Sequence, residues 1–160
     1  MREYRVTKYD PAFRDARGSY TRDEWFSECQ VGRVFDGVVL TREEYQRVEG
    51  AYVVAVIGFL LEAGVSAMTV VGLENYGNVQ LAFGEGNALP LGQIGEVIGQ
   101  VLRAKFWCRL EGPEAFVHFG YDYYMYVGVP WACPAAKRLA RRVGLFVEPF
   151  RSPHRVRERK

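Results

Sequence analysis

Residues 116–130, FVHFGYDYYMYVGVP, decide the predicted fold class because they place six aromatic rings in one stretch rich in strand-forming residues. In an extended strand, alternate side chains point to opposite faces. One face carries Phe116, His118, Gly120, Asp122, Tyr124 and Tyr126; the more apolar face, predicted to join the core, carries Val117, Phe119, Tyr121, Tyr123, Met125 and Val127. The stretch therefore predicts a strand whose mixed face is a candidate binding surface, with Gly120 as a possible bulge.

The preceding residues 105–112, KFWCRLEG, predict a neighbouring strand, and a turn at Gly112 and Pro113 connects the two. A long helix is predicted over residues 42–63. Thr41 followed by Glu44 has the pattern of a capping box, and Gly64 is suited to a left-handed cap at the other end. Apolar residues recur along this helix at steps of three and four, which indicates one buried face: Tyr45, Val48, Tyr52, Val56, Phe59, Leu60 and Ala63.

Residues 66–74 predict a buried strand, and residues 77–83, GNVQLAF, predict its antiparallel neighbour across the turn at 75–78. A second helix is predicted over 89–105, with three glycines on the side expected to pack tightly on the sheet: Gly92, Gly95 and Gly99. A third helix follows from Pro134 to about residue 143, before a last strand at 145–150. This order predicts an α+β fold, a mainly antiparallel sheet with about three helices on one face.

The N-terminal part is less regular. Residues 3–9 alternate as in a strand, and residues 10–25, DPAFRDARGSYTRDEW, predict a long ordered loop. Aromatic residues are expected to hold this loop in place: Phe13, Tyr20, Trp25 and Phe26. A short strand is predicted around residues 32–40. Loops of this length inside a compact domain often serve a function, so this one is a candidate binding element.

The charge of the chain is unevenly distributed. Residues 1–130 hold 12 Lys and Arg against 17 Asp and Glu, a net charge of −5, whereas residues 131–160 carry +7. With 160 residues, 49% of them hydrophobic, the chain predicts a single α+β domain over 1–150 and a basic flexible C-terminal tail over 151–160. The basic third helix and tail leave nucleic-acid binding open as an alternative function.

Cysteine usage and hydropathy point to a cytoplasmic protein without membrane contact. Cys29, Cys108 and Cys133 are odd in number and far apart, which argues against a disulfide framework and a zinc site. The longest apolar stretch, which begins at Ala51, contains Glu62 and is too short to span a bilayer.

No residue pattern predicts a catalytic centre, a metal site or a cofactor. No serine lies in a GxSxG setting, and His118 and Asp122 would stand about 13 Å apart along one strand. A pair formed by Cys108 and His118 from neighbouring strands, or a carboxylate pair, leaves a small enzyme as a second alternative. Acidic residues of the N-terminal loop are interleaved with arginines, which favours local ion pairs over a cation site.

Several stretches resemble a known group of proteins: YRVTKYDPAFRDARGSYTRDEW from residue 4, LTREEYQRVEGAY from residue 40, KFWCRLEGPEAFVHFGYDYYMYVGV from residue 105, and GLFVEPFRSP from residue 144. They cover nearly the whole chain. The chain resembles small uncharacterised bacterial cytoplasmic proteins that are associated with immunity proteins of polymorphic or contact-dependent toxin systems. The resemblance implies a single domain that binds a toxin nuclease or other cognate toxin domain and blocks it without catalysis of its own. It transfers no site residues, since such families share no common site motif.

An inhibitor of this kind needs acidic and aromatic groups that complement a basic cleft. The sequence offers two sets of candidate partner-binding residues: Asp10, Asp15, Tyr20, Asp23, Glu24 and Trp25 in the N-terminal loop, and His118, Asp122, Tyr124 and Tyr126 on the aromatic strand. The chain is expected to be a monomer or a homodimer, the latter if the aromatic strand pairs with its own copy.

Overall fold

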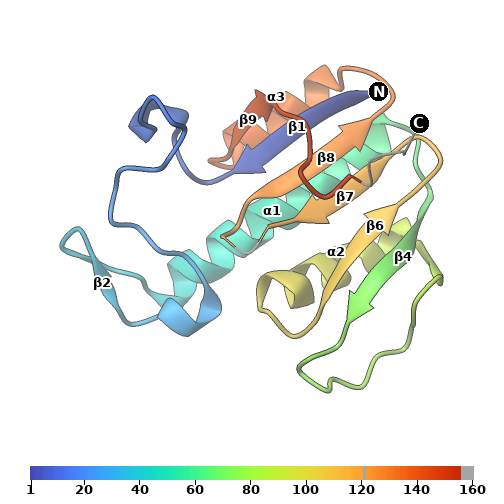
Figure 1. Ribbon diagram of the computed structural model, residues 1–160, viewed down its shortest axis with the longest axis horizontal. Helices are drawn as coiled ribbons and strands as arrows, with labels where there is room; N and C mark the ends of the chain where they lie inside the picture. Colours follow the sequence, from blue (N-terminus) through green and yellow to red (C-terminus); the bar gives the residue numbers. More distant parts are fainter. Residues whose placement is uncertain (121, 156–160) are drawn as a thin grey trace.

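A seven-stranded antiparallel sheet with strand order β5-β4-β6-β7-β8-β1-β9 forms the centre of the computed structural model, which describes residues 1–120 and 122–155 (Figure 1). The strands are β1 (Arg2–Thr7), β4 (Ala67–Glu74), β5 (Ala88–Pro90), β6 (Trp107–Glu111), β7 (Phe116–Phe119), β8 (Met125–Val129) and β9 (Phe146–Pro149). A separate hairpin consists of β2 (Val34–Phe35) and β3 (Val38–Val39). The helices are α1 (Arg42–Glu62), α2 (Leu91–Leu102) and α3 (Pro134–Arg142), with 3-10 turns η1 (Pro11–Phe13) and η2 (Glu28–Gln30).

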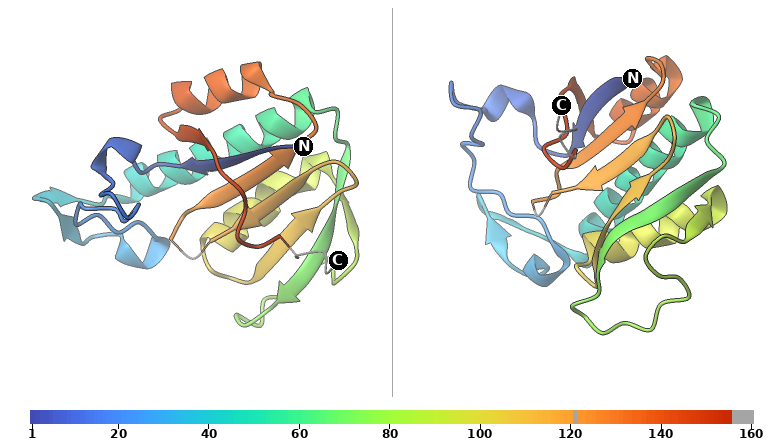
Figure 2. Two further views of the ribbon diagram at one scale, coloured as in Figure 1. Left: turned by 45° about the horizontal axis from the view of Figure 1, so that its top comes forward. Right: turned by 45° about the vertical axis from the view of Figure 1, so that its right-hand side comes forward.

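All three helices lie on one face of the sheet, with α1 between α2 and α3 (Figures 1 and 2). The predicted α+β class and the helix layer are therefore confirmed. The opposite face is called the outer face below.

The local signals that predict α1 are confirmed. The Thr41 hydroxyl accepts a hydrogen bond from the Glu44 backbone N–H at 3.1 Å, and Gly64 has a φ of +74° immediately after the helix. The capping box is only half formed, because the Glu44 carboxylate binds Arg47. The predicted apolar side of α1 is buried along its length.

The glycine side of α2 contacts α1, not the sheet as predicted. A Cβ atom at Gly95 would lie 3.1 Å from Val53 Cγ1, and one at Gly99 would lie 3.5 Å from Glu49 Oε1. Gly92 faces open space. Two of the three glycines therefore allow close approach of the two helices.

The aromatic stretch forms a hairpin, which corrects the single strand predicted from the sequence. β7 and β8 pair with His118 opposite Tyr126, and the Gly120 N–H donates to the Tyr124 carbonyl oxygen at 2.6 Å across the turn. The predicted alternation survives, because Val117, Phe119, Met125 and Val127 are buried on the helix side. Tyr121 lies outside the described residues. Both strands have neighbours on either side, so the aromatic strand has no free edge for pairing with a second copy.

Two further strand predictions are corrected. Residues 77–83 are not a strand; instead the Glu85 carboxylate accepts hydrogen bonds from the backbone N–H groups of Gly72 (3.0 Å) and Leu73 (2.7 Å), beside a bulge in β4. Residues 32–40 form the β2–β3 hairpin instead of one strand. Asp36 and Gly37 at its tip both have positive φ, as a type I′ turn requires.

A cluster of tyrosines joins the β7–β8 turn to α1. Tyr123 is buried with a φ of +59°, a conformation that is strained for a bulky residue. Its hydroxyl lies 2.6 Å from that of Tyr45, and the Tyr52 hydroxyl donates to the Tyr123 carbonyl oxygen at 2.6 Å. Each of the two paired hydroxyls has a second acceptor within reach, Glu49 for Tyr45 (2.9 Å) and the Leu102 carbonyl for Tyr123 (3.0 Å). Contacts from three directions therefore hold the turn in its strained form.

Replacing Tyr123 with Phe removes one hydroxyl from this buried network and leaves the Leu102 carbonyl without that donor. We expect a loss of about 1–3 kcal/mol in the free energy of unfolding, measured by chemical denaturation. Tyr124→Phe is the matched control, because the Tyr124 hydroxyl has no hydrogen bond to residues 1–120 or 122–155. Equal losses in the two variants would contradict the assigned role of the network.

Candidate functional site

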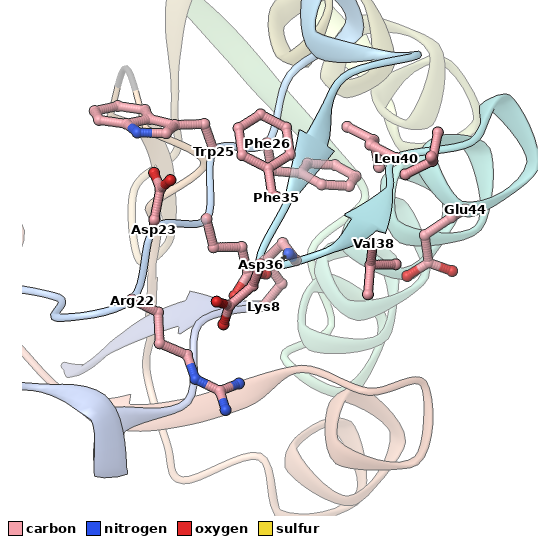
Figure 3. Close-up of a pocket in the computed structure, with 12 residues that line it drawn as sticks. Lys8, Arg22, Asp23, Trp25, Phe26, Phe35, Asp36, Val38, Leu40 and Glu44 are labelled. Atoms are coloured by element: carbon pink, nitrogen blue, oxygen red, sulfur yellow. Dashed lines mark hydrogen bonds and ion pairs between the residues drawn. The ribbon is translucent and has the colours of Figure 1, made fainter.

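Two adjoining hollows lie beside the N-terminal loop, which comprises residues 8–33 between β1 and β2. The first has a volume of about 390 Å³, and Figure 3 shows the residues that line it, from the loop, the β2–β3 hairpin and the start of α1. They are Lys8, Arg22, Asp23, Glu24, Trp25, Phe26, Phe35, Asp36, Val38, Val39, Leu40 and Glu44.

The second hollow has a volume of about 220 Å³ and lies between the loop and the β7–β8 turn. It is lined by Tyr9, Tyr20, Arg22, Glu24, Trp25, Asp122 and Tyr124. Arg22, Glu24 and Trp25 line both hollows, which together are called the groove below. The fold thus brings together candidate residues about one hundred positions apart in the sequence, from the loop and from the aromatic stretch.

Carboxylates outnumber cations along the groove. Five acidic residues line it, Asp23, Glu24, Asp36, Glu44 and Asp122, against Lys8 and Arg22. Both cations are engaged: Lys8 forms an ion pair with Glu24, and the Arg22 guanidinium lies 3.8 Å from the centre of the Phe13 ring. Within the described part of the chain, Asp23, Asp36 and Asp122 form no ion pair, so their charge remains available to a partner.

The groove also exposes large apolar side chains. Trp25 is 59% exposed and Val38 is 70% exposed, and Val39, which also lines the first hollow, is 49% exposed. Burial and the hydrogen bond to Glu24 raise the pKa of Tyr20 to about 12, so this phenol stays neutral. The groove therefore combines aromatic and aliphatic surface with unpaired negative charge.

Asp10 and Asp15, two further candidate residues, do not line the groove. The Asp10 carboxylate caps η1 by accepting from the Ala12 N–H at 2.9 Å. The Asp15 carboxylate accepts from the N–H groups of Arg17 and Ser19, both at 2.9 Å. These two carboxylates hold the shape of the N-terminal loop.

His118 and Tyr126, the remaining candidates, lie on the outer face beneath residues 150–155, which are called the C-terminal segment below. His118 Nδ1 lies 2.7 Å from Ser152 Oγ, and its Nε2 lies 2.8 Å from Glu111 Oε1. The Nε2–H donates to the Glu111 carboxylate, and Nδ1 hydrogen bonds with the Ser152 hydroxyl. Both nitrogens are therefore used within the chain, and neither His118 nor Tyr126 lines the groove.

The Ser152, His118 and Glu111 contacts have the order of a hydrolytic triad, but the surroundings do not suit a nucleophile. Ser152 is only 4% exposed, and its oxygen also accepts from the His154 N–H at 3.2 Å. A nucleophile must be reached by its substrate. The arrangement instead fastens the C-terminal segment, together with an ion pair between Arg155 and Glu3 at 2.7 Å.

Residues 151–155 thus lie against the sheet, and residues 156–160 of the predicted tail are outside the described part. No local pattern marks Ser152 as buried, because its distant partners His118 and Glu3 precede it by more than thirty residues.

The proposed Cys108–His118 pair does not form, because Cys108 faces the helices and His118 faces the C-terminal segment on the other side of the sheet. Burial raises the pKa of Cys108 to about 12, so its thiol is protonated at neutral pH. All three cysteines are free. Among residues 1–120 and 122–155, no group of three or more His, Cys, Asp or Glu side chains could hold a metal ion.

Comparisons with protein-family models, curated proteins and solved structures found no match to this chain. No helix in the described ranges combines the length and apolar character needed to cross a membrane.

Glu111 gives the outer face a testable pH dependence. Burial acts to raise its pKa, but the hydrogen bond from His118 and the charges of His118, Arg109 and Arg155 lower it on balance. A carboxyl whose pKa is lowered by folding stabilises the protein above its unfolded pKa, near 4.3, and that contribution is lost as the pH falls through the folded value.

We therefore expect Glu111→Gln to lower the free energy of unfolding by about 1 kcal/mol at neutral pH, and the difference from wild type to shrink below about pH 4. Denaturant titrations across this pH range measure the effect, with exposed Glu114→Gln as the control. A difference that does not change with pH would contradict this role of the Glu111 charge.

Proposed function

We propose that this chain is a non-catalytic protein-binding module that recognises a basic face of a partner protein through the groove. The observation that carries the proposal is the combination of exposed apolar anchors, Trp25 and Val38, with the unpaired carboxylates Asp23, Asp36 and Asp122 around adjoining hollows. Aromatic anchors supply most of the energy of protein interfaces, and complementary charge speeds association.

The shape of the groove favours a protein partner. Its apolar surface includes strand β3 of the hairpin, where Val38 and Val39 line the first hollow and are 70% and 49% exposed. A small molecule in either hollow would leave this surface in water, whereas a protein face covers both hollows and the hairpin together.

The specific form of the proposal is an immunity-type inhibitor that acts in the cytoplasm and neutralises a bacterial toxin domain. A nuclease toxin suits the groove, because the active-site cleft of a nuclease carries basic residues that bind phosphate. The acidic residues of the groove can bind to those basic residues in place of phosphate. The basic C-terminal segment does not stand against this proposal: none of residues 150–155 lines the groove, and Arg155 is paired with Glu3.

The test uses the tagged full chain to capture partners from its native cells over a series of salt washes. Wild type is expected to retain one protein in stoichiometric amount. Reversing two unpaired charges, by Asp23→Lys together with Asp36→Lys, is expected to slow association with that protein about tenfold at low salt, measured by surface plasmon resonance. The effect should weaken as the salt concentration rises.

The matched control is the double variant Glu74→Lys and Glu114→Lys, which makes the same change in net charge at two exposed carboxylates that line neither hollow. Equal association rates for the two double variants would overturn the proposed groove. Recovery of salt-sensitive nucleic acid in place of a protein would instead favour the alternative role, with Arg138, Arg141 and Arg142 exposed on α3.

A further inference from the structure

Helix α3 forms one margin of the helix layer and packs closely on α1 (Figure 2). Gly58 permits this approach, because a Cβ atom there would lie 2.9 Å from Leu139 Cδ2. A hollow of about 430 Å³ lies between the two helices, with Gly58 and Leu61 on one side and Arg138, Leu139 and Arg142 on the other. It is called the furrow below. No residue that lines it also lines the groove.

The arginines of α3 form an unpaired cationic cluster. Arg138, Arg141 and Arg142 are exposed, and none of them has an ion pair with residues 1–120 or 122–155. They lie within about 6 Å of one another along the helix axis, at a rise of about 1.5 Å per residue. Three like charges at this spacing repel one another, so an occupant with several closely spaced negative charges would stabilise them.

The carboxylates beside α3 are already engaged. The Glu62 carboxylate, which lines the furrow, accepts hydrogen bonds from two backbone N–H groups at the start of α3, at 3.2 and 2.6 Å. Its charge therefore complements the helix dipole. Glu148 lines a neighbouring hollow together with Arg141. Its carboxylate is shared by Arg5 and Arg14, at 3.2 and 2.7 Å. The charges of this surface therefore select an anionic occupant.

Trp131 adds an aromatic ring at the end of the furrow. Its indole N–H donates to the Glu62 carbonyl oxygen at 3.2 Å, which fixes the position of the ring next to a lining residue. The side chain is 50% exposed, and no aromatic ring or cation among residues 1–120 and 122–155 lies against it. Part of the ring is therefore open to a group from outside the chain.

We propose that α3, the furrow and Trp131 form a binding surface for single-stranded nucleic acid, called the α3 surface below. A planar guanidinium binds phosphate through two hydrogen bonds, and a strand supplies one phosphate with every nucleotide. An exposed aromatic ring stacks on an unpaired base. The proposal adds a second function and does not depend on the proposed function, because the α3 surface and the groove share no residue.

The composition of α3 favours a strand over the other anionic partners. The exposed positions of the helix are proline, alanine and arginine, so α3 itself offers no large apolar anchor to an acidic protein. The bases of a duplex are stacked on one another, and they present no open face to Trp131. A single strand satisfies both the arginines and the ring.

The experiment measures fluorescence anisotropy of a labelled DNA single strand of about 20 nucleotides and mixed sequence, with the full chain, over a series of salt concentrations. We expect micromolar binding at low salt. Arg138→Ala together with Arg142→Ala is expected to weaken binding at least tenfold at low salt. The same double variant should reduce the slope of log affinity against log salt by about 1.4, since each phosphate contact contributes about 0.7. Trp131→Leu is expected to weaken binding about tenfold, whereas Trp131→Phe should retain most of it.

The matched control is the double variant Arg17→Ala and Arg33→Ala, which removes two exposed arginines that line neither the furrow nor the groove. Circular dichroism verifies the fold of each variant. Equal losses in the two double variants, an unchanged salt slope, or full binding by Trp131→Leu would each overturn the α3 surface.

A duplex of the same sequence and polyglutamate are the comparison ligands, and both are expected to bind more weakly than the single strand. Equal affinity for either one would overturn the assignment to single strands, because charge alone would then decide binding. The groove is tested separately by the Asp23 and Asp36 charge reversals, so either proposal can fail while the other stands.

Discussion

The contact between the hydroxyl groups of Tyr45 and Tyr123 connects three parts of the molecule that the groove requires. Tyr45 belongs to the first turns of α1, Tyr123 to the β7–β8 turn, and the ring of Phe26, from the N-terminal loop, packs on both. The Phe26 ring stacks on Tyr45 with planes at 14° and meets Tyr123 edge-on at 79°. Without this junction neither the loop nor the turn would have a fixed position relative to the helix, and Asp122 would have no defined place opposite Tyr20.

The junction is buried, whereas the charged groups of the groove are at the surface. The positions of those charged groups therefore depend on the packing of the core. Asp122 and Tyr124 flank Tyr123, and Glu24 and Trp25 directly precede Phe26. Each buried ring therefore fixes the direction of the lining side chains beside it. Such an arrangement limits the conformational entropy lost when a partner binds, which is how preorganised surfaces gain affinity.

The sequence was sufficient for features that depend on local signals. The cap at Thr41, the glycine at residue 64 and the regular burial of α1 follow from side chains a few positions apart. The strand over 116–130 was predicted too long, because strand propensity does not reveal that Tyr123 takes a left-handed conformation. Its contacts with Tyr45 and Tyr52 stabilise that turn. Of the candidate residues, Tyr20, Glu24, Trp25, Asp122 and Tyr124 meet in one hollow, whereas His118 is enclosed by Ser152, which composition assigned to the tail. These errors share a cause: contacts between residues far apart in the chain produce no periodic pattern in the sequence.

The Glu85 carboxylate has a consequence for the behaviour of the protein at high concentration. An unpaired strand edge invites a strand from another molecule, which is a common route to aggregation. Beyond its short pairing with β5, the edge of β4 presents the N–H groups of Gly72 and Leu73, and Glu85 occupies both. The two outermost strands, β5 and β9, each end in a proline, Pro90 and Pro149, which has no N–H to donate. The Glu85 side chain and the two prolines thus protect the edges of the sheet from intermolecular strand addition. The protein can therefore expose the aromatic surface of the groove with less risk of aggregation through its sheet edges.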